Sequence, residues 1–194
     1  MREGKLERNT KETSIQAWLA LDGTGCADVS TGIGFFDHML ISWAVHGGFD
    51  LTLKAEGDLQ VDGHHTVEDC GIVLGKALGL ALADKSGLCR YGSFWLPMDD
   101  ALAMAAVDVS GRPFLHFNAA FRNERIGDFE TCLTREFFQA LAFNAGITLH
   151  INLLYGENDH HGCEAIFKAV GHALSGAVMK NSSGEALSTK GVLA

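Results

Sequence analysis

The chain has 194 residues with a formal net charge of −9, and 47% of its residues are hydrophobic and 20% charged. This length is enough for one domain with a sizeable core, and the composition is ordinary for a soluble globular protein. No cluster of Lys or Arg accompanies the acidic balance. A nucleic-acid partner is therefore not expected, because binding a phosphate backbone needs a basic surface.

The cysteine content favours a reducing compartment. The five cysteines are scattered without a CxxC motif: Cys26, Cys70, Cys89, Cys132 and Cys163. Such a pattern does not support a disulfide framework. The N-terminal residues are polar and lack the apolar core of a signal peptide, and the longest apolar stretch, 71–83, is too short to span a bilayer. We expect a cytoplasmic protein with no membrane partner.

The first half of the chain contains alternating and helical patterns of apolar residues. In chain order, we expect strands at 13–21 and 26–30, a helix at 35–45, a strand at 49–55, and a helix from His64 to about 82. Asp22-Gly23 predicts a hairpin turn between the first two strands. Gly47-Gly48 stands where a helix C-cap is typical.

The second half repeats this order. We expect strands at 90–96, 101–109 and 114–118, a helix at 131–144, a strand at 147–154, and a helix from His160 to about 178. When the halves are superposed, His38 falls opposite Glu136, His46 opposite Asn144, and Gly48 opposite Gly146. This predicts a duplicated β-β-α-β-α unit, in which helices pack on one face of a mostly antiparallel sheet, an α+β fold. Residues 1–194 would form one domain of two repeats, about 1–87 and 88–194.

Two histidine pairs, each followed by a glutamate, carry the clearest chemical signal. They are His64-His65-Thr-Val-Glu68 and His160-His161-Gly-Cys-Glu164. On a helix, positions i and i+4 lie about 40° apart and i and i+3 about 60° apart, so either histidine can share a metal ion with the glutamate. Adjacent positions diverge by about 100°, so the two histidines of a pair cannot easily bind one ion. We predict a dinuclear or subunit-bridging site for first-row divalent ions.

The two motifs need further ligands if each of two ions takes four protein groups. The duplication nominates His38 and its counterpart Glu136. Asp37, beside His38, is suited to cap a helix or to orient a histidine ring. A histidine outside such a motif is more often a satisfied core residue, and we expect this for His116, His150 and His172.

Several basic residues near segment ends are candidates for binding an anion: Arg90, Arg112, Lys168 and Lys190. Taken singly, each is an ordinary surface charge. Lys168 is the best candidate, because it lies four residues beyond Glu164 on the same helix face. The tail Ser188-Thr189-Lys190-Gly191 adds two hydroxyls and an ammonium group, which together suit an anion clamp.

Taken together, these motifs resemble the imidazoleglycerol-phosphate dehydratase family in its monofunctional form. The resemblance covers nearly the whole chain through six segments: Arg8-Asn-Thr-Lys-Glu-Thr, Gly32-Ile-Gly-Phe-Phe-Asp-His-Met-Leu, His46-Gly-Gly, Asp62-Gly-His-His-Thr-Val-Glu-Asp, Asn158-Asp-His-His-Gly-Cys-Glu-Ala-Ile-Phe-Lys and Ser188-Thr-Lys-Gly. It implies a ribosomal protein S5 domain 2-like fold, two Mn2+ ions per subunit, and a homo-oligomer of about 24 subunits with active sites between them.

The resemblance also implies residue roles. The implied metal ligands are His38, His64, His65, Glu68, His160, His161 and Glu164, and the remaining ligand position, a histidine in many relatives, is Glu136 here. The implied substrate-binding residues are Glu12, His38, His46, His64, Glu68, Arg90, Arg112, His160, Lys168, Ser188, Thr189 and Lys190, of which Arg90, Arg112, Lys168, Ser188 and Lys190 would hold a phosphate. The candidate catalytic residues are Glu12, His46, Glu68 and Glu164. Ile41-Ser42 replaces a more usual Asp-Gln.

The implied reaction removes water from D-erythro-imidazole-glycerol phosphate to give imidazole-acetol phosphate in L-histidine biosynthesis. The proton that leaves is not next to a carbonyl, so the imidazole ring, bound to both metal ions, would serve as the electron sink through a diazafulvene-like intermediate. Glu12 is the candidate acid/base. Two alternatives remain open, a dinuclear metallohydrolase of phosphoesters and a metal-binding shell without catalysis.

Overall fold

The computed structural model describes residues 2–182 and 184–189. Within them the first half contains β1 (Glu3–Asn9), β2 (Thr13–Ala20), β3 (Ala27–Ser30), α1 (Gly34–Gly47), β4 (Asp50–Gly57) and α2 (His64–Leu82). The second half contains β5 (Tyr91–Met98), β6 (Ala101–Asp108), β7 (Phe114–Asn118), β8 (Arg125–Ile126), β9 (Phe129–Glu130), α3 (Leu133–Ala145), β10 (Thr148–Tyr155) and α4 (Asp159–Val178).

The strands form two four-stranded sheets with the same topology. Their orders are β1-β2-β4-β3 and β5-β6-β10-β7, and β8 pairs only with β9. In each four-stranded sheet the first two pairings are antiparallel and the last, at the edge, is parallel. The expected α+β class and the duplication are therefore confirmed, and each four-stranded sheet holds one strand more than the β-β-α-β-α unit.

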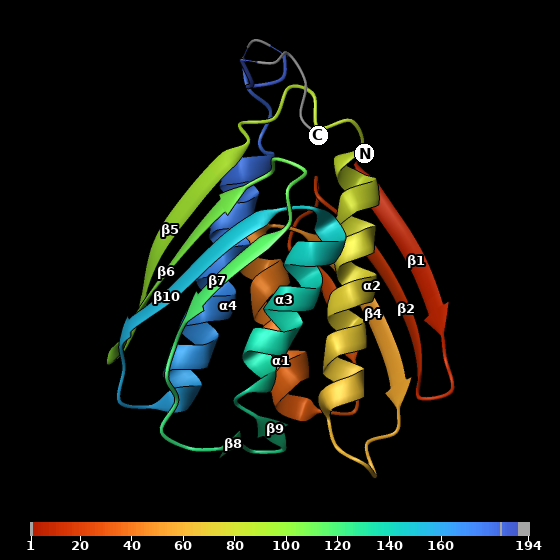
Figure 1. Ribbon diagram of the computed structural model, residues 1–194, viewed down its shortest axis with the longest axis vertical. Helices are drawn as coiled ribbons and strands as arrows, with labels where there is room; N and C mark the ends of the chain where they lie inside the picture. Colours follow the sequence, from red (N-terminus) through yellow and green to blue (C-terminus); the bar gives the residue numbers. More distant parts are fainter. Residues whose placement is uncertain (1, 183, 190–194) are drawn as a thin grey trace.

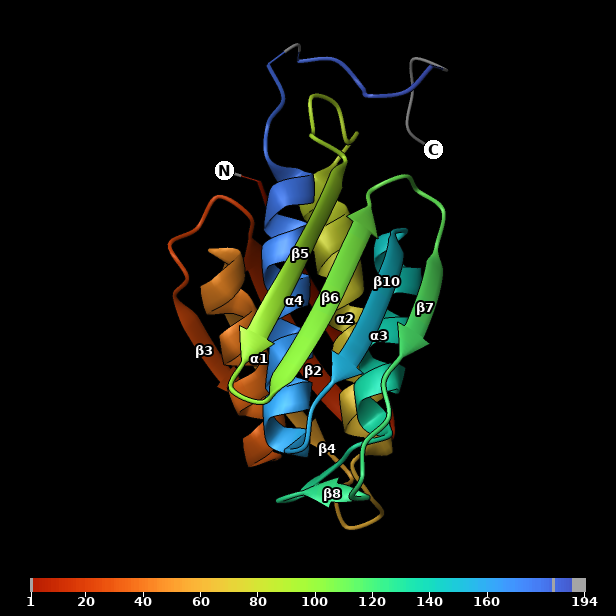
Figure 2. The same cartoon turned by 90° about the vertical axis from the view of Figure 1, so that its left-hand side faces the viewer.

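The four helices lie between the two sheets (Figures 1 and 2). α1 and α2 cover one face of the first sheet, and α3 and α4 cover one face of the second. Across the middle, α1 packs against α4 and α2 against α3. Buried apolar residues from both repeats join in one core cluster, whose largest side chains include Trp43, Phe36, Phe137 and Phe167. Each sheet thus buries one face, as its alternating pattern requires.

Glycines hold equivalent positions in the two repeats. Gly48 (φ 70°) and Gly146 (φ 66°) end α1 and α3 in the left-handed conformation, which confirms the C-cap expectation and the superposition of the halves. In the first strand of each repeat, Gly4 and Gly92 lie against the long helix. A Cβ added at either would stand 1.9 Å from the carbonyl oxygen of Ala77 or Ala173 respectively.

One expectation about the first sheet was wrong. β2 and β3 do not form a hairpin through Asp22-Gly23, because β2 pairs antiparallel with β4 and β3 pairs with β4 on its other side. The connecting segment is held by Asp50, whose Oδ1 accepts from the backbone N–H of Thr24 (2.8 Å) and Cys26 (2.9 Å). A turn dipeptide is a local signal, whereas the pairing is decided by which strand buries its apolar face.

The first strand, β1, was not expected. Its residues are mostly charged and only Leu6 packs against the core, so the strand lacks the apolar alternation that marks a half-buried strand. It pairs along its length with β2 at the edge of the sheet, where charged residues are common. Along the described residues, no helix combines the length and apolar character needed to cross a bilayer.

Candidate active site

Three of the predicted metal ligands meet at the contact between α1 and α4. Their ligand atoms, from His38, His160 and Glu164, all lie within 4.8 Å of one another. Oε2 of Glu164 is 3.5 Å from Nε2 of His38 and 3.2 Å from Nε2 of His160. The ring of Phe35 packs edge-on against both imidazoles, with centroids 6.5 Å and 5.0 Å away. Residues that are more than 120 positions apart in the sequence are thereby brought together.

Glu164 is the anchor of this cluster. Its side chain is only 8% exposed, and its Oε1 accepts a hydrogen bond from Nζ of Lys168 at 2.7 Å. Burial by itself would raise the pKa of Glu164, but Lys168, His38 and His160 together lower it below the ordinary value. The carboxylate is therefore ionised at neutral pH, with Oε1 held by the lysine and Oε2 turned toward the two histidines.

This donor set fits a divalent metal ion. Imidazole nitrogen with a carboxylate oxygen is a combination that suits first-row divalent ions. Three protein ligands also leave coordination positions for a substrate or for ligands from elsewhere. Lys168 supports the ionised form of the carboxylate without occupying the oxygen that faces His38 and His160.

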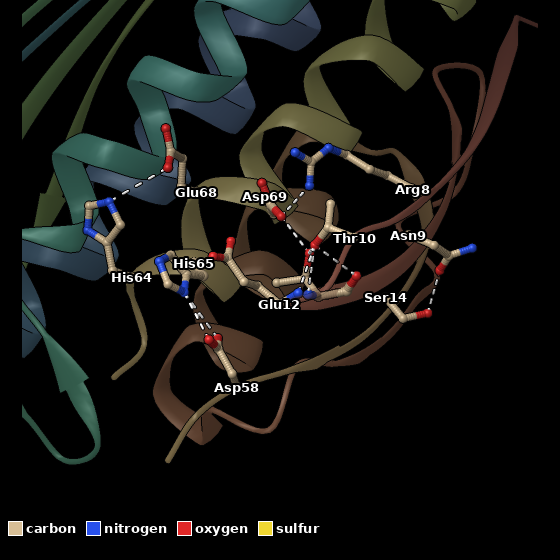
Figure 3. Close-up of polar contacts among 11 residues, drawn as sticks. Arg8, Asn9, Thr10, Glu12, Ser14, Asp58, His64, His65, Glu68 and Asp69 are labelled. Carbon is tan, nitrogen blue, oxygen red and sulfur yellow. Dashed lines mark hydrogen bonds and ion pairs between the residues drawn. The ribbon is translucent and has the colours of Figure 1, made fainter. Parts of the chain in front are cut away.

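The second histidine of each pair faces a different partner. Nδ1 of His65 lies 3.0 Å from Oδ2 of Asp58, and Nδ1 of His161 lies 2.5 Å from Oδ1 of Asp100. These aspartates raise the pKa of their histidines by hydrogen bonding to them. The rings within each pair stand at 85° and 77° to one another. The divergence predicted from helix geometry is confirmed, and Figure 3 shows His64 and His65 turned to different partners.

The equivalent region between α2 and α3 is less closely assembled. Nε2 of His64 is 3.6 Å from Oε2 of Glu68, whose side chain is 46% exposed. Oε1 of Glu136, on α3, lies 3.4 Å from Nη1 of Arg135. Among the described residues, Glu136 does not join His64 and Glu68 in a group of ligand atoms as close as the one around Glu164. The duplication therefore reproduces the motif but not the cluster.

Glu12 lies in the turn between β1 and β2, beside the first histidine pair. Its backbone N–H donates to Oγ1 of Thr10, and its carbonyl oxygen accepts from the N–H of Asp58 at 3.1 Å. Figure 3 shows the Glu12 carboxylate next to His65, and the two side chains interact electrostatically. The turn thus brings an exposed carboxylate to the start of α2.

The predicted phosphate-binding residues form two groups. Arg90 makes a two-pronged ion pair with Asp108 (2.7 and 3.2 Å) and donates to the carbonyl of Leu187, which precedes Ser188 and Thr189. Arg112 reaches the same aspartate at 3.6 Å. Lys168 lies elsewhere, beside Glu164 and Met98. Lys190 is outside the described residues.

The distance between these groups follows from α4. The backbone N–H of Arg90 donates to the carbonyl of Ala177, nine residues beyond Lys168 on the helix. At a rise of about 1.5 Å per residue, the two groups stand roughly 13 Å apart along the axis. Their side chains also contact different residues, Leu187 and Asp108 for Arg90 and Glu164 for Lys168. Within one chain they do not form one anion clamp.

Sequence reasoning missed the side chains that orient the histidines. Asp58 and Asp100 both lie between expected elements. Asp58 stands seven residues before His65, which is a usable signal, whereas Asp100 is 61 residues from His161 and only the fold brings them together. Asp37 was expected to cap a helix or orient a ring. It accepts instead from the backbone and hydroxyl of Thr31, and the N-cap residue of α1 is Ile33.

The expectation for the isolated histidines was also wrong. His116 and His150 are exposed and stack on one another on the outer face of the second sheet. His172 is partly buried, but it contacts His46, one of the residues implied in substrate binding. Hydrophobic context predicts burial poorly for histidine because the ring tolerates both the core and the surface.

The fold and the site define the class of protein. Each repeat contributes a helix that carries HHxxE, and one of the two motifs joins with a third ligand into a cluster suited to a divalent ion. Basic residues able to bind an anion lie beside it and at the far end of the same helix. These features are those of an enzyme acting on a small anionic molecule.

The sequence identifies the family within that class. The family model of imidazoleglycerol-phosphate dehydratase matches residues 31–174. The imidazoleglycerol-phosphate dehydratase of Cereibacter sphaeroides strain KD131 is 56% identical over 195 positions that cover all of both chains. That of Acetivibrio thermocellus is 54% identical over 193 positions, 99% of each chain. The chain belongs to the imidazoleglycerol-phosphate dehydratase family and is a carbon–oxygen lyase.

Solved structures agree. The crystal structure of imidazoleglycerol-phosphate dehydratase from Staphylococcus aureus N315 superposes with a TM-score of 0.84 at 40% identity, covering 92% of this chain and 99% of the other. The structure of IGPD from Pyrococcus furiosus, in complex with (S)-C348, superposes with a TM-score of 0.82 at 37% identity over 97% and 100% of the two chains. The family and the fold are therefore supported independently.

Proposed function

We propose that the chain carries out the dehydration of imidazoleglycerol phosphate in histidine biosynthesis at a site that requires divalent metal ions, with Mn2+ the expected ion. The reaction follows from membership of the family. The metal requirement is carried by one observation, the cluster of His38, His160 and Glu164. The substrate is D-erythro-imidazole-glycerol phosphate and the product imidazole-acetol phosphate.

One ion would be held by His38, His160 and Glu164, and a second by His64 and Glu68 with Glu136 in the outlying position. Each ion would act as a Lewis acid on a nitrogen of the substrate's imidazole ring. His65 and His161 are turned away from these sets, toward Asp58 and Asp100. Their orientation supports ligation to ions held mainly by neighbouring subunits.

The remaining residues bind substrate and move protons. The carboxylate of Glu12, beside His65, is the proposed acid/base. Glu68, Glu164 and His46 act at the same centre, and Glu164 is kept ionised by Lys168. The phosphate is assigned to Arg90, Arg112, Lys168, Ser188 and the neighbouring Thr189, together with Lys190, which lies outside the described residues.

The division of the phosphate-binding residues supports active sites between subunits. Arg90 and Lys168 stand roughly 13 Å apart along α4, so one phosphate would take them from different chains. The outer face of the second sheet also exposes large aromatic side chains, among them Tyr91, Trp95 and Phe114, which are typical of an interaction surface. We infer a homo-oligomer of about 24 subunits.

Two further proposals concern the organisation of the chain. We assign it to the cytoplasm, supported by five cysteines that are all free. We also treat residues 1–194 as one dehydratase domain built from two repeats. This is supported by a single core cluster that draws on both.

The decisive experiment measures turnover, metal content and particle mass on the same preparation. We expect elimination of water from imidazole-glycerol phosphate, loss of activity after EDTA treatment, and recovery with Mn2+. We also expect about two Mn2+ per chain and dissociation of the particle into smaller oligomers on chelation. Full activity in a metal-free preparation would contradict the proposal. Phosphate release from simple esters would favour a hydrolase, and a metal-loaded but inert particle would favour a binding shell.

A further inference from the structure

His172 on α4 and His46 on α1 form a side-chain pair, and of the two only His46 has a role in the proposed reaction. Nε2 of His172 lies 3.2 Å from Nδ1 of His46, and the two rings stand at 74° with centroids 5.2 Å apart. On its other side, the ring of His172 stacks on Phe94 of β5, at 4.2 Å and 20°. The position of the His172 ring is therefore set by stacking as well as by the hydrogen bond.

The contact restricts the protonation of both rings. A hydrogen bond between two imidazoles needs an N–H on one and a lone pair on the other, so the two facing nitrogens share a single proton. Burial lowers the pKa of His172. The pKa of His46 is also lowered, mainly by burial and further by the nearby charges of Lys168 and His172, although the negative charge of Glu164 acts to raise it. Both rings are thus expected to be neutral near pH 7, each with one nitrogen committed to the other.

The pair also lies on the face of α4 that carries the cluster. Lys168 follows Glu164 by four residues and His172 follows Lys168 by four, so the three side chains share one helix face. The other repeat has no such pair. Asn144, opposite His46, donates to the carbonyl of Ala140 in its own helix. The fold itself therefore does not require two histidines here.

We propose that His172 is a positioning residue of the dehydratase, which holds Nδ1 of His46 so that His46 meets the substrate through Nε2 alone. The inference rests on the proposed function, in which His46 contacts the substrate. His172 itself would not touch the substrate. It fixes the rotation of the His46 ring and determines whether Nε2 donates or accepts a hydrogen bond.

The first test compares three variants of the complete, Mn2+-loaded protein. His172→Phe keeps an aromatic ring on Phe94 but removes the nitrogen, and we expect kcat to fall about 10–100-fold with KM changed far less. His172→Gln supplies a group that can again bond to Nδ1, and we expect it to recover most of the lost kcat. Asn144→Ala, at the position opposite His46 in the other repeat, is the matched control and should turn over like the wild type.

The second test asks whether His172 acts through His46. In a His46→Ala background, His172→Phe should cause no further loss, because the residue it positions is gone. Phe94→Leu, which weakens the stacking and leaves both nitrogens, should lower kcat in the same direction but less. This variant provides the evidence if His172→Phe does not fold.

The outcomes distinguish the proposed function from the proposed role of His172. Wild-type protein that is loaded with Mn2+ but does not dehydrate the substrate overturns the proposed function, and this inference with it. If the wild type is active, three results would overturn only the role of His172. These are full activity of His172→Phe, equal losses of activity in the Phe and Gln variants, and additive losses when His46 and His172 are both substituted. Unchanged kcat in a folded Phe94→Leu variant also counts against it.

Discussion

The helix pairs α1–α4 and α2–α3 each join a helix of one repeat to a helix of the other and are equivalent in the duplication, but they surround their histidine motifs differently. At α1–α4, Glu164 is 8% exposed, binds Lys168 and faces His38 from the neighbouring helix. At α2–α3, Glu68 is 46% exposed, and the position four residues on is Ile72. The residue opposite His38 in the repeat is a second carboxylate, Glu136.

This difference teaches that a duplicated motif does not by itself make a duplicated site. A buried carboxylate needs a nearby cation to remain ionised, and Lys168 provides it for Glu164. Two carboxylates facing one ion repel each other until the ion arrives. We therefore expect the α1–α4 cluster to be formed before metal binds, and the α2–α3 set to be brought together by the metal.

The largest expected effect separates the two glutamates. Glu164→Gln leaves Lys168, only 15% exposed, without its partner, so we expect the metal-free protein to lose about 3 kcal/mol of unfolding free energy. Glu68→Gln, at an exposed position, should change it by less than about 0.5 kcal/mol. Both substitutions remove a proposed ligand and should lower turnover at least about 100-fold. Denaturant unfolding after EDTA treatment measures the loss of unfolding free energy in each variant. Equal losses in the two variants would contradict the expected difference between Glu164 and Glu68.

A second effect concerns the order of metal binding. His38→Ala should weaken binding of the first Mn2+ about 10–100-fold, because it removes a ligand from the preformed cluster. Glu136→Ala should leave the first binding event nearly unchanged and weaken the second. Calorimetric titration of metal-free protein with Mn2+ resolves the two events. The reverse order would show that the α2–α3 set is the tighter one.

The close packing of helices should matter equally in the α1–α4 and α2–α3 pairs, although their metal sites differ. A Cβ at Gly171 would stand 2.6 Å from the carbonyl oxygen of Trp43, and one at Gly75 would stand 2.6 Å from that of Leu141. Alanine at either position should cost about 1–3 kcal/mol. Gly79, whose nearest neighbour is 3.7 Å away, is the matched control, and Gly79→Ala should stabilise the helix by up to about 1 kcal/mol. Thermal unfolding measures all three variants.

The smallest expected effect on stability concerns an ion pair near the start of each repeat. Arg2 pairs with Asp22 in the first repeat, as Arg90 pairs with Asp108 in the second. Hydrogen bonds from Arg2 lower the pKa of Asp22 from 3.8 to about 2. The stabilisation is therefore complete above the unfolded value and is lost as the pH falls from 3.8 toward 2.

Because the Asp22 side chain is 45% exposed, solvent screening should keep this contribution below about 1 kcal/mol. Denaturant unfolding of the wild type and of Asp22→Asn should differ most near neutral pH. The difference should shrink between about pH 4 and pH 2.5. A difference that is independent of pH would mean that the ion pair is not its source.

Local patterns predicted most elements, because periodicity and capping act within a few residues. The helix expected from His64 to about 82 is α2, and the strand expected at 114–118 is β7. The same reasoning missed β1, whose stability comes from pairing with β2 rather than from apolar alternation. It also misjudged Asp22-Gly23, because a turn signal does not choose the strand's partner.

For the site, the sequence by itself determined which groups could share an ion. The turn of a helix places each histidine relative to its glutamate, and the duplication nominated His38. Only the tertiary structure decided that Glu164 is buried against Lys168, that Asp58 and Asp100 hold the second histidines, and that Arg90 and Lys168 are far apart. These facts depend on distances between segments that are remote in sequence, and packing of whole helices and sheets sets those distances.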